Sequence, residues 1–410
     1  MDNLPLHVFI ISSIVKILII AHLLIIGVMA MIWSERRVSG WMQDRLGPNR
    51  VGPQGLLQPI ADGIKFLFKE DLIPNHVDKP LYVLAPVMLL VPAMIAIAVV
   101  PFGSSMTILG HEIPLQIADI NIGILYILAI TSLGVYGVVI GAWASNNKYS
   151  LLGGLRSSAQ MISYELTLGL AIIGVLMLTD LPDEILTKLG DDEVNPLSLR
   201  HIAYAQGVHS WNILVHFPAF LAFTTAMFAE TNRLPFDLAE AEQELVAGYH
   251  TEYSSMKFAI FFMAEYMNMI VGSAVVVTLF LGGWHFFGLE AIGGPFWSGV
   301  ISFAILFVKT GVFLFVFIWV RWTLPRFRYD QLMNFGWKFL LPVALTSIVV
   351  TGTLYIATNG NRLWIGIGNV VAAFIVVAIV AGMLAMDNNS KSAVQSTPAA
   401  APLRGLDAVE

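Results

Sequence analysis

The chain has 410 residues, of which 57% are hydrophobic and only 12% are charged, and its formal net charge is −6. Its mean hydropathy of +0.75 lies far above that of soluble proteins, which excludes an ordinary soluble domain. The absence of cysteine excludes disulfides and thiolate-ligated metal or iron–sulfur clusters in this chain.

Apolar runs of about 20 residues recur along the whole chain, and each is long enough to cross a bilayer as a helix. They predict an all-α polytopic membrane protein with about nine transmembrane helices, in a single domain over residues 1–386. A β-barrel is disfavoured, because barrel strands are short and alternate in polarity. The predicted spans are residues 8–32, 82–101, 119–143, 160–179, 212–229, 256–282, 297–322, 338–358 and 364–386.

Lysine and arginine are distributed unevenly between the two sides of these spans. The loop after the first span and the loops on the same side hold most of them, whereas the opposite side has only Lys188, Arg200 and Arg362. Because basic loops stay in the cytoplasm, we expect the N-terminus outside and the C-terminus inside. The first span has no basic leader and no convincing cleavage site, so we interpret it as a retained helix rather than a signal peptide.

The first cytoplasmic loop contains two Gly-Pro turns, which are followed by a segment with two distinct faces. Apolar residues recur at helical spacing along residues 53–70, and Asp62, Lys65 and Lys69 belong to the opposite stripe. The segment is too short and too polar to span, so it predicts an amphipathic helix that lies in the membrane interface. The alternative is a surface helix that only anchors the loop.

The carboxylates Glu165 and Glu265 fall inside predicted spans, and so do Lys16 and Lys309. A charge inside a bilayer is expensive, so such groups are usually paired, face a polar cavity or are functional. A purely structural buried pair remains the alternative for each of them. In the outside loop at residues 180–211 we find no metal-ligand spacing, and its two histidines, His201 and His209, are expected to be solvated.

The most acidic stretch follows the fifth span, at residues 229–253, and contains several carboxylates but a single arginine, Arg233. Pro235 breaks the preceding helix, and Asp237 can cap a second helix. Arg233 can pair with Glu230 if the first helix continues that far. Carboxylates crowded at a membrane boundary repel one another and share protons, although an acidic helix start that faces water is the alternative. The candidate site carboxylates of this acidic loop are Glu230, Asp237, Glu240, Glu242 and Glu244.

The loop after the seventh span brings Arg321, Arg326 and Arg328 to the side that holds the acidic loop. Residues 387–410 are rich in Ala, Ser and Pro and predict a disordered cytoplasmic tail. The residues alone therefore indicate either a proton or ion pathway, or a site for an amphiphile at the cytoplasmic interface.

Three long motifs resemble the signatures of one known family. Residues 35–37 and 43–65 read Glu-Arg-Arg and Gln-Asp-Arg-Leu-Gly-Pro-Asn-Arg-Val-Gly-Pro-Gln-Gly-Leu-Leu-Gln-Pro-Ile-Ala-Asp-Gly-Ile-Lys. The acidic loop at residues 229–253 and the segment Pro-Arg-Phe-Arg-Tyr-Asp-Gln-Leu-Met at 325–333 follow in the family's order. These motifs resemble the H-subunit of the bacterial NADH–quinone oxidoreductase, the counterpart of subunit 1 of mitochondrial respiratory complex I. The family core is usually described with eight spans, so the ninth span and the tail go beyond it.

The resemblance implies a membrane subunit of a proton-translocating enzyme that forms much of its quinone chamber. A quinone, with ubiquinone favoured, would be the substrate, and its head group would be reduced beyond this chain by an iron–sulfur cluster of a peripheral subunit. The resemblance implies no metal, no bound cofactor and no redox centre in this chain, with FMN and clusters only in partner subunits. The implied partners are the cluster-bearing and quinone-site peripheral subunits, the small membrane subunits of the adjoining arm and membrane lipid, but no nucleic acid. The implied location is the bacterial inner membrane.

The resemblance also implies roles for individual residues, and the predicted interfacial helix adds Ala61 as a neighbour of the chamber opening. The opening and its charge would be shaped by Glu35, Arg36, Arg45, Ala61, Asp62 and Lys65. The acidic loop facing the chamber would consist of Glu230, Arg233, Asp237, Glu240, Glu242 and Glu244. The proton pathway would begin at Glu165 and Glu265, with its acidity balanced by Arg321, Arg326 and Arg328.

Two alternatives stay open at this point. The related membrane subunit of membrane-bound hydrogenases shares the fold and the acidic loop, but the complete first loop with its interfacial helix favours the quinone enzyme. A stand-alone ion transporter would show internal inverted symmetry, which we do not find in this sequence.

Overall fold

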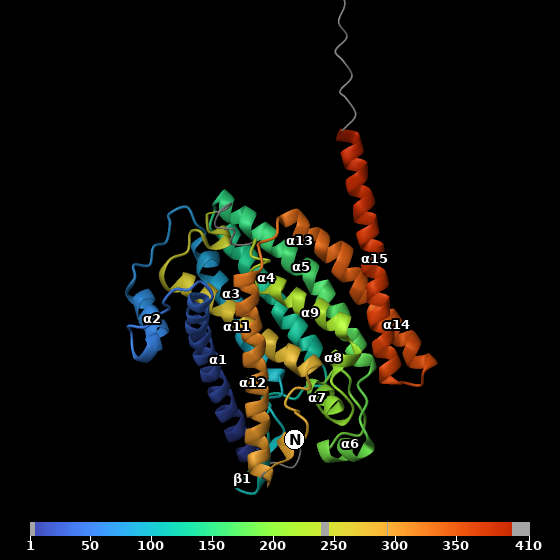
Figure 1. Cartoon of the computed structure of the whole chain (residues 1–410). Helices are drawn as coiled ribbons and strands as arrows, with labels where there is room; N and C mark the ends of the chain where they lie inside the picture. The colour runs from blue at the N-terminus through green and yellow to red at the C-terminus, as the bar shows by residue number, and fades with distance from the viewer. Residues whose placement is uncertain (1–4, 239–245, 293, 396–410) are drawn as a thin grey trace, which may run out of the picture.

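The computed structural model describes residues 5–238, 246–292 and 294–395, which form a bundle of helices (Figure 1). Within these residues, eight helical segments are long and apolar enough to cross a membrane, which confirms the predicted all-α polytopic fold class. The spanning segments are α1 (Leu6–Met42), α3 (Lys79–Ala96) with η2 (Ile97–Val99), α4 (Gly123–Ala144), α5 (Lys148–Met177), α11 (Ser255–Phe280), α12 (Gly294–Thr323), α13 (Tyr329–Phe335) joined through the π-helical turn η5 (Gly336–Leu340) to α14 (Leu341–Ala357), and α15 (Arg362–Gln395).

The fifth predicted span, residues 212–229, is divided into two short helices, α8 (Asn212–Val215) and α9 (Phe217–Glu230). Pro218 lies in the first turn of α9, where a proline fits, but it cannot continue a helix from the residues before it. α9 has 14 residues, fewer than the roughly 20 that cross the hydrocarbon core as one helix. The acidic loop therefore begins directly after a short apolar helix that ends at Glu230.

The predicted interfacial helix at residues 53–70 is also divided, into the 3₁₀ turn η1 (Pro53–Gly55) and the helix α2 (Gln58–Phe68). Gly55 has a φ of +76°, and a Cβ added there would lie 2.3 Å from the carbonyl oxygen of Pro48. The chain therefore turns tightly at this glycine, and the helix begins only afterwards. α2 lies beside α1 at the edge of the bundle (Figure 1) and exposes apolar side chains, as an interfacial helix does.

α15 continues beyond the predicted end of the last span and projects from the bundle (Figure 1). The predicted boundary at residue 386 falls inside this helix, because residues 383–397 contain no glycine or proline to end it. Residues 396–410, the remainder of the predicted tail, lie outside the described residues.

The connections at the opposite end of the bundle contain short elements. They are the antiparallel hairpin of β1 (Ser105–Ile108) and β2 (His111–Pro114), the helices α6 (Asp183–Leu189) and α7 (Leu199–Val208), and the turn η4 (Leu289–Ala291). The turn η3 (Gly248–His250) belongs instead to the acidic loop. His201, in one of these connections, was expected to be exposed to solvent, and this prediction is wrong. This histidine is buried, its Nδ1 accepts the backbone N–H of Asn195 at 2.9 Å, and its Nε2 lies 2.8 Å from Asp191 Oδ2. Leu186 and Leu189 of α6 pack with Leu181 and with Ala205 of α7 in a small apolar cluster of the same loop.

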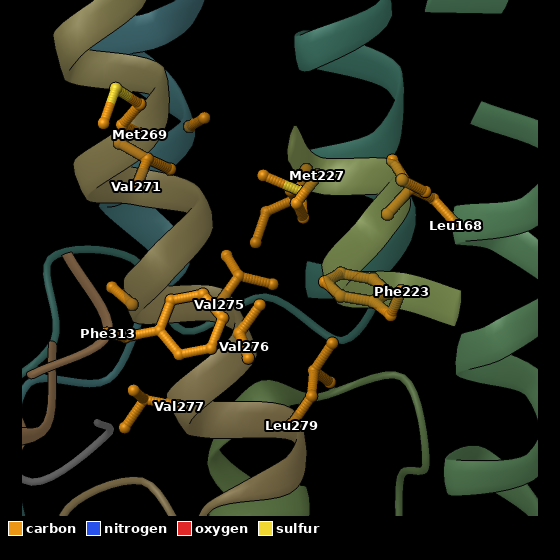
Figure 2. Packing of buried hydrophobic residues seen from close by; sticks show 14 of the residues in the cluster. Leu168, Phe223, Met227, Met269, Val271, Val275, Val276, Val277, Leu279 and Phe313 are labelled. Atoms are coloured by element: carbon orange, nitrogen blue, oxygen red, sulfur yellow. The ribbon is translucent and has the colours of Figure 1, made fainter. Parts of the chain in front are cut away.

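α11 is the most deeply buried of the spanning helices, with 72% of its apolar window inside the described structure. Figure 2 shows its Val275 and Leu279 close to Phe223 and Met227 of α9. Gly272 allows this approach, because a Cβ added there would lie 1.9 Å from the Met227 methyl carbon. Side chains of α11 therefore contact elements on several sides at once.

Lys309, the lysine inside α12, contacts the chain just after α11 ends at Phe280. Its ammonium group donates to the carbonyl oxygens of Leu281 at 2.6 Å, Gly283 at 3.0 Å and His285 at 2.6 Å. These carbonyl groups belong to the C-cap of α11 and the turn after it, where a cation also complements the helix dipole. These contacts give Lys309 a structural explanation.

A Lys309→Met variant is expected to lose stability by about 2 kcal/mol or more, because three carbonyl groups lose a charged donor. The measurement is the thermal unfolding midpoint of the purified protein in detergent, combined with limited proteolysis of the α11–α12 connection. Lys148→Met, which removes an exposed lysine, is the control and should change neither. A Lys309→Met protein with the parental midpoint and cleavage rate would contradict the structural role.

Candidate functional site

A cavity of about 760 Å³, here called the chamber, lies between α1, α2 and α11. Its walls are mostly apolar and include Val28 and Ile32 of α1, Ile64 of α2 and Met263 of α11. An apolar cavity with a few convergent polar groups is typical of a small-molecule site. The predicted site residues Glu35, Arg36, Arg45, Asp62 and Arg321 also line the chamber.

Ion pairs join α1 to α2 at one side of the chamber. Arg36 Nη1 lies 2.6 Å from Asp62 Oδ2, and Lys65 Nζ lies 3.5 Å from Asp62 Oδ1. Burial alone would raise the pKa of the Asp62 carboxyl, but the nearby Arg36, Gln58 and Lys65 outweigh it and lower that pKa below its ordinary value. Asp62 therefore stays ionised and holds α2 against α1.

Two further predicted positions differ in how they relate to the chamber. Arg45 lines it, and its guanidinium donates to Ser39 Oγ at 3.3 Å and to Gln43 Oε1 at 2.7 Å. Ala61, in contrast, is not among the lining residues, whereas Gly63 on the same helix is. A Cβ added at Gly63 would meet no atom within 4 Å, so this glycine faces open space.

Glu35 is buried at the end of the chamber and is held by groups from two other helices. It forms an ion pair with Arg321 of α12, and its Oε2 accepts the hydroxyl proton of Tyr266 of α11 at 2.6 Å. A buried carboxylate requires such partners, because removal from water is costly without them. Glu35 therefore connects the first span to both α11 and α12.

Arg233 and Glu265 form a second buried charge pair next to the first. Arg233 Nη2 lies 4.0 Å from Glu265 Oε2, and the guanidinium lies over the Tyr266 ring, 4.2 Å from its centroid. Glu265 Oε1 accepts the hydroxyl proton of Tyr249 at 2.8 Å. Because α9 ends at Glu230, Arg233 reaches α11 rather than continuing the helix on which a pair with Glu230 was expected.

The start of the acidic loop is folded around Gln160 of α5. The Gln160 amide donates to the carbonyl oxygens of Ala229 and Phe236, each at 2.8 Å. The Tyr164 ring, one turn further along α5, packs edge-on against Phe236 at 5.7 Å between centroids. These contacts fix the turn that positions Arg233 beside α11.

The other predicted residues of the two loops are placed as follows. Asp237 Oδ2 lies 2.7 Å from Arg326 Nη2, so the acidic loop is joined to the basic loop. Arg328 is exposed and begins α13, where its backbone N–H donates to Gln331 Oε1 at 3.1 Å. The remaining acidic positions, Glu240, Glu242 and Glu244, lie outside the described residues.

The two intramembrane carboxylates have different neighbours. Glu165 of α5 interacts electrostatically with Glu230, which also has the hydroxyl of Thr131 nearby. Glu265 interacts with Arg233 and also with Asp237. Glu165 therefore lies near Glu230 at the beginning of the acidic loop, whereas Glu265 lies near Arg233 and Asp237, which come later in the same loop.

Sequence reasoning missed Tyr249, Tyr266 and Gln160, which supply hydrogen bonds to the predicted charges and the acidic loop. Tyr266 follows Glu265 directly, and Tyr249 lies inside the acidic-loop motif. Their positions beside predicted site residues were the available signal, since a buried carboxylate needs a donor. Gln160 gave no comparable signal, because its partners are backbone carbonyl groups.

The same segments match known proteins. Residues 15–352 match a family described as NADH dehydrogenase. An H-subunit of NADH-quinone oxidoreductase from Koribacter versatilis, numbered 2 there, is 50% identical over 371 residues, which cover 85% of this chain and 98% of the relative. An H-subunit of NADH-quinone oxidoreductase from Geobacter sulfurreducens, numbered 1 there, is 49% identical over 361 residues, covering 85% of this chain and 96% of the relative. These names do not favour the hydrogenase or transporter alternatives.

Motifs, spanning helices and relatives agree along most of the chain. The eight apolar helices found in the described residues make it a multi-pass membrane protein, and the family match extends from α1 into α14. The expected resemblance is confirmed: the chain belongs to the NADH dehydrogenase family, together with the H-subunits of NADH-quinone oxidoreductases.

Proposed function

We propose that the chain is the membrane-embedded H-subunit of a proton-pumping NADH:quinone oxidoreductase and that its chamber accepts the quinone. The observation that supports this proposal is the form of the chamber, which is apolar along α1, α2 and α11 and has buried charges at one end. A long isoprenoid tail matches the apolar walls, whereas a quinone head group needs the polar end. The head group is then reduced beyond this chain by an iron–sulfur cluster of a peripheral subunit.

The orientation follows from the same proposal. The basic first loop and the acidic loop face the cytoplasm and contact the peripheral subunits, and the N-terminus lies outside. The chain is placed in the bacterial inner membrane, with the small membrane subunits of the adjoining arm as further neighbours. FMN and the clusters belong to the partner subunits.

We further propose that the buried charges couple quinone reduction to proton movement. Glu35 and Glu265 are linked through consecutive residues of α11, because Tyr266 donates to Glu35 and also lies under Arg233, the partner of Glu265. A change of charge at Glu35 therefore alters the electrostatic environment of Arg233 in the acidic loop. Glu165 and Glu265 are the proposed first members of the chain of carboxylates that transfers protons toward the adjoining arm.

A Gly63→Leu variant tests the chamber. The leucine would occupy part of the open space at Gly63, and overfilling a site typically costs about 1–3 kcal/mol. We expect the apparent KM to rise about tenfold for a long-tailed quinone and much less for a short-tailed analogue, because only the long tail fills the whole chamber. The measurement is steady-state quinone reduction by the assembled complex.

Gly311→Leu on α12 is a matched control, because a Cβ added at Gly311 also meets no atom within 4 Å and this glycine does not line the chamber. Its KM for either quinone should stay at the parental value. Equal effects of Gly63→Leu on long-tailed and short-tailed quinones would indicate a general assembly defect and count against the proposed chamber.

A further inference from the structure

A second cavity, of about 500 Å³, lies on the other side of α1, between α1, α11 and α12. It is here called the α1–α12 cavity, and it is lined by Leu24, Met31, Ile270, Leu306 and Gly311 among others. The α1 residues that line it differ from those that line the chamber, so α1 separates the two spaces. The proposed function uses only the chamber and leaves this cavity without an occupant.

The body of the α1–α12 cavity is apolar and is kept open by small residues. Gly27 contacts Ile270, where an added Cβ would lie 3.0 Å from the Ile270 Cδ1, and Gly311 faces empty space. The cavity is open at one side, where the lining side chains of Trp41, Phe307 and Phe315 are exposed. The space is also within the range of small-molecule sites, so its dimensions and walls fit a hydrocarbon chain.

The basic end of the same cavity is polar and is lined by Trp33, Ser34, Arg37 and Trp41. One Arg37 N–H donates to the Pro48 carbonyl oxygen at 3.1 Å, and its guanidinium lies 5.7 Å from the Trp41 ring centroid. Within the described residues, Arg37 forms no ion pair with a carboxylate. A guanidinium has five donors in a planar fork that matches a phosphate, so donors of Arg37 remain for a second partner.

We propose that the α1–α12 cavity binds one membrane phospholipid, with an acyl chain in the apolar body and the phosphate on Arg37. Residues 20–37 of α1 extend over about 25 Å, whereas one leaflet of the bilayer contributes roughly 15 Å of hydrocarbon. The cavity can therefore hold a whole acyl chain below the level of Arg37. Tryptophans are enriched at the interface between hydrocarbon and head groups, and Trp33 and Trp41 lie where the glycerol backbone would be.

Charge complementarity distinguishes a phospholipid from a second quinone in this cavity. A quinone head group is neutral and offers two acceptor oxygens, whereas a phosphate is anionic and is bound preferentially by arginine. In the chamber, Arg36 and Arg321 have carboxylate partners in Asp62 and Glu35, and the guanidinium of Arg45 donates to Gln43 and Ser39. Arg37 is the cation at the polar end that matches an anion from outside the chain.

The test uses the assembled complex, purified in mild detergent from the native membrane, and native mass spectrometry with phosphorus analysis of the bound phospholipid. Arg37→Gln removes the phosphate ligand, and Gly311→Leu fills the hydrocarbon space. Both variants are expected to lose one retained phospholipid per complex while the KM for a long-tailed quinone stays unchanged. Gly63→Leu is the matched control, with the opposite result: an unchanged phospholipid count and an increased KM.

Three outcomes would overturn the proposal. One is an unchanged phospholipid count in both variants, and another is recovery of a quinone instead of a phospholipid as the molecule that Gly311→Leu displaces. The third is efficient cross-linking of a photoreactive residue at position 311 to another protein of the complex, which would show that a protein helix fills the cavity. If Arg37→Gln prevents assembly, Gly311→Leu and Gly311→Phe decide the question, because the open space at Gly311 tolerates a side chain. The Gly63→Leu result is independent, so failure of this proposal is distinguishable from failure of the proposed quinone chamber.

Discussion

An Arg233→Ala variant of the assembled complex is expected to reduce quinone at least about a hundredfold more slowly than the parental enzyme. Electron transfer from NADH to an artificial acceptor, which does not require the membrane subunit, should remain at the parental rate. In the parental protein, Nη2 of Arg233 lies 4.0 Å from the Glu265 carboxylate. In the variant, Glu265 would lose this buried counter-charge. Removing one partner of a buried pair typically costs about 3–5 kcal/mol.

Two controls separate this effect from loss of assembly. Arg233→Lys keeps the positive charge but loses the planar guanidinium that lies over Tyr266, so it should retain intermediate activity. Arg200→Ala removes an ion pair with Asp119, and neither residue lines the chamber. Quinone reduction by the assembled Arg200→Ala complex should therefore be normal. Parental quinone reduction by an assembled Arg233→Ala complex would eliminate the proposed role of this residue.

The second large effect is expected for Glu265→Gln. Glutamine keeps the shape of the side chain, but it removes the negative charge that pairs with Arg233 and cannot bind or release a proton. We expect turnover and coupled proton pumping to fall together by about tenfold or more. The Tyr249 hydroxyl would no longer donate to a charged carboxylate, and a hydrogen bond to a charged group contributes about 1.5–3 kcal/mol. Glu265→Asp keeps the charge and should retain more activity than Glu265→Gln.

The measurement is NADH-driven proton uptake into vesicles that contain the assembled variant. Glu165→Gln belongs to the same experiment, because Glu165 interacts with Glu230 at the start of the acidic loop. A structural carboxylate that does not balance a buried cation tolerates conversion to a neutral amide, which is easier to bury than a charge. If both glutamine variants pump at the parental rate, these carboxylates are structural and the proton pathway lies elsewhere.

The sequence was sufficient to predict the fold class, because membrane spans depend on local composition that can be read along the chain. It was less informative where one residue changes the local geometry. Gly55 delays the start of α2, and Pro218 separates α8 from α9. Neither changes the hydropathy of its segment, so neither break was visible in the apolar runs.

The candidate site was predictable in its residue types but not in its pairings. Arg233 and Glu265 were both chosen as important, yet Glu230 was the expected partner of Arg233, because only neighbours on one helix can be paired from sequence. The observed pair depends on the turn that Gln160 holds through backbone carbonyls. The same applies to Lys309, whose partners are carbonyl groups after the end of α11.

The arrangement of Glu265 and Tyr266 on α11 has a thermodynamic consequence. Consecutive residues of an α-helix point about 100° apart, so one turn of this rigid helix contacts Arg233 on one side and Glu35 on the other. A ligand that favours one arrangement of Glu35 then changes the free energy of the Arg233–Glu265 ion pair. By thermodynamic linkage, this ion pair changes the binding free energy of the ligand by the same amount. The affinity for a quinone therefore depends on the acidic loop. A substitution in that loop, at a residue that does not contact the chamber, should change the dissociation constant of an inert quinone analogue.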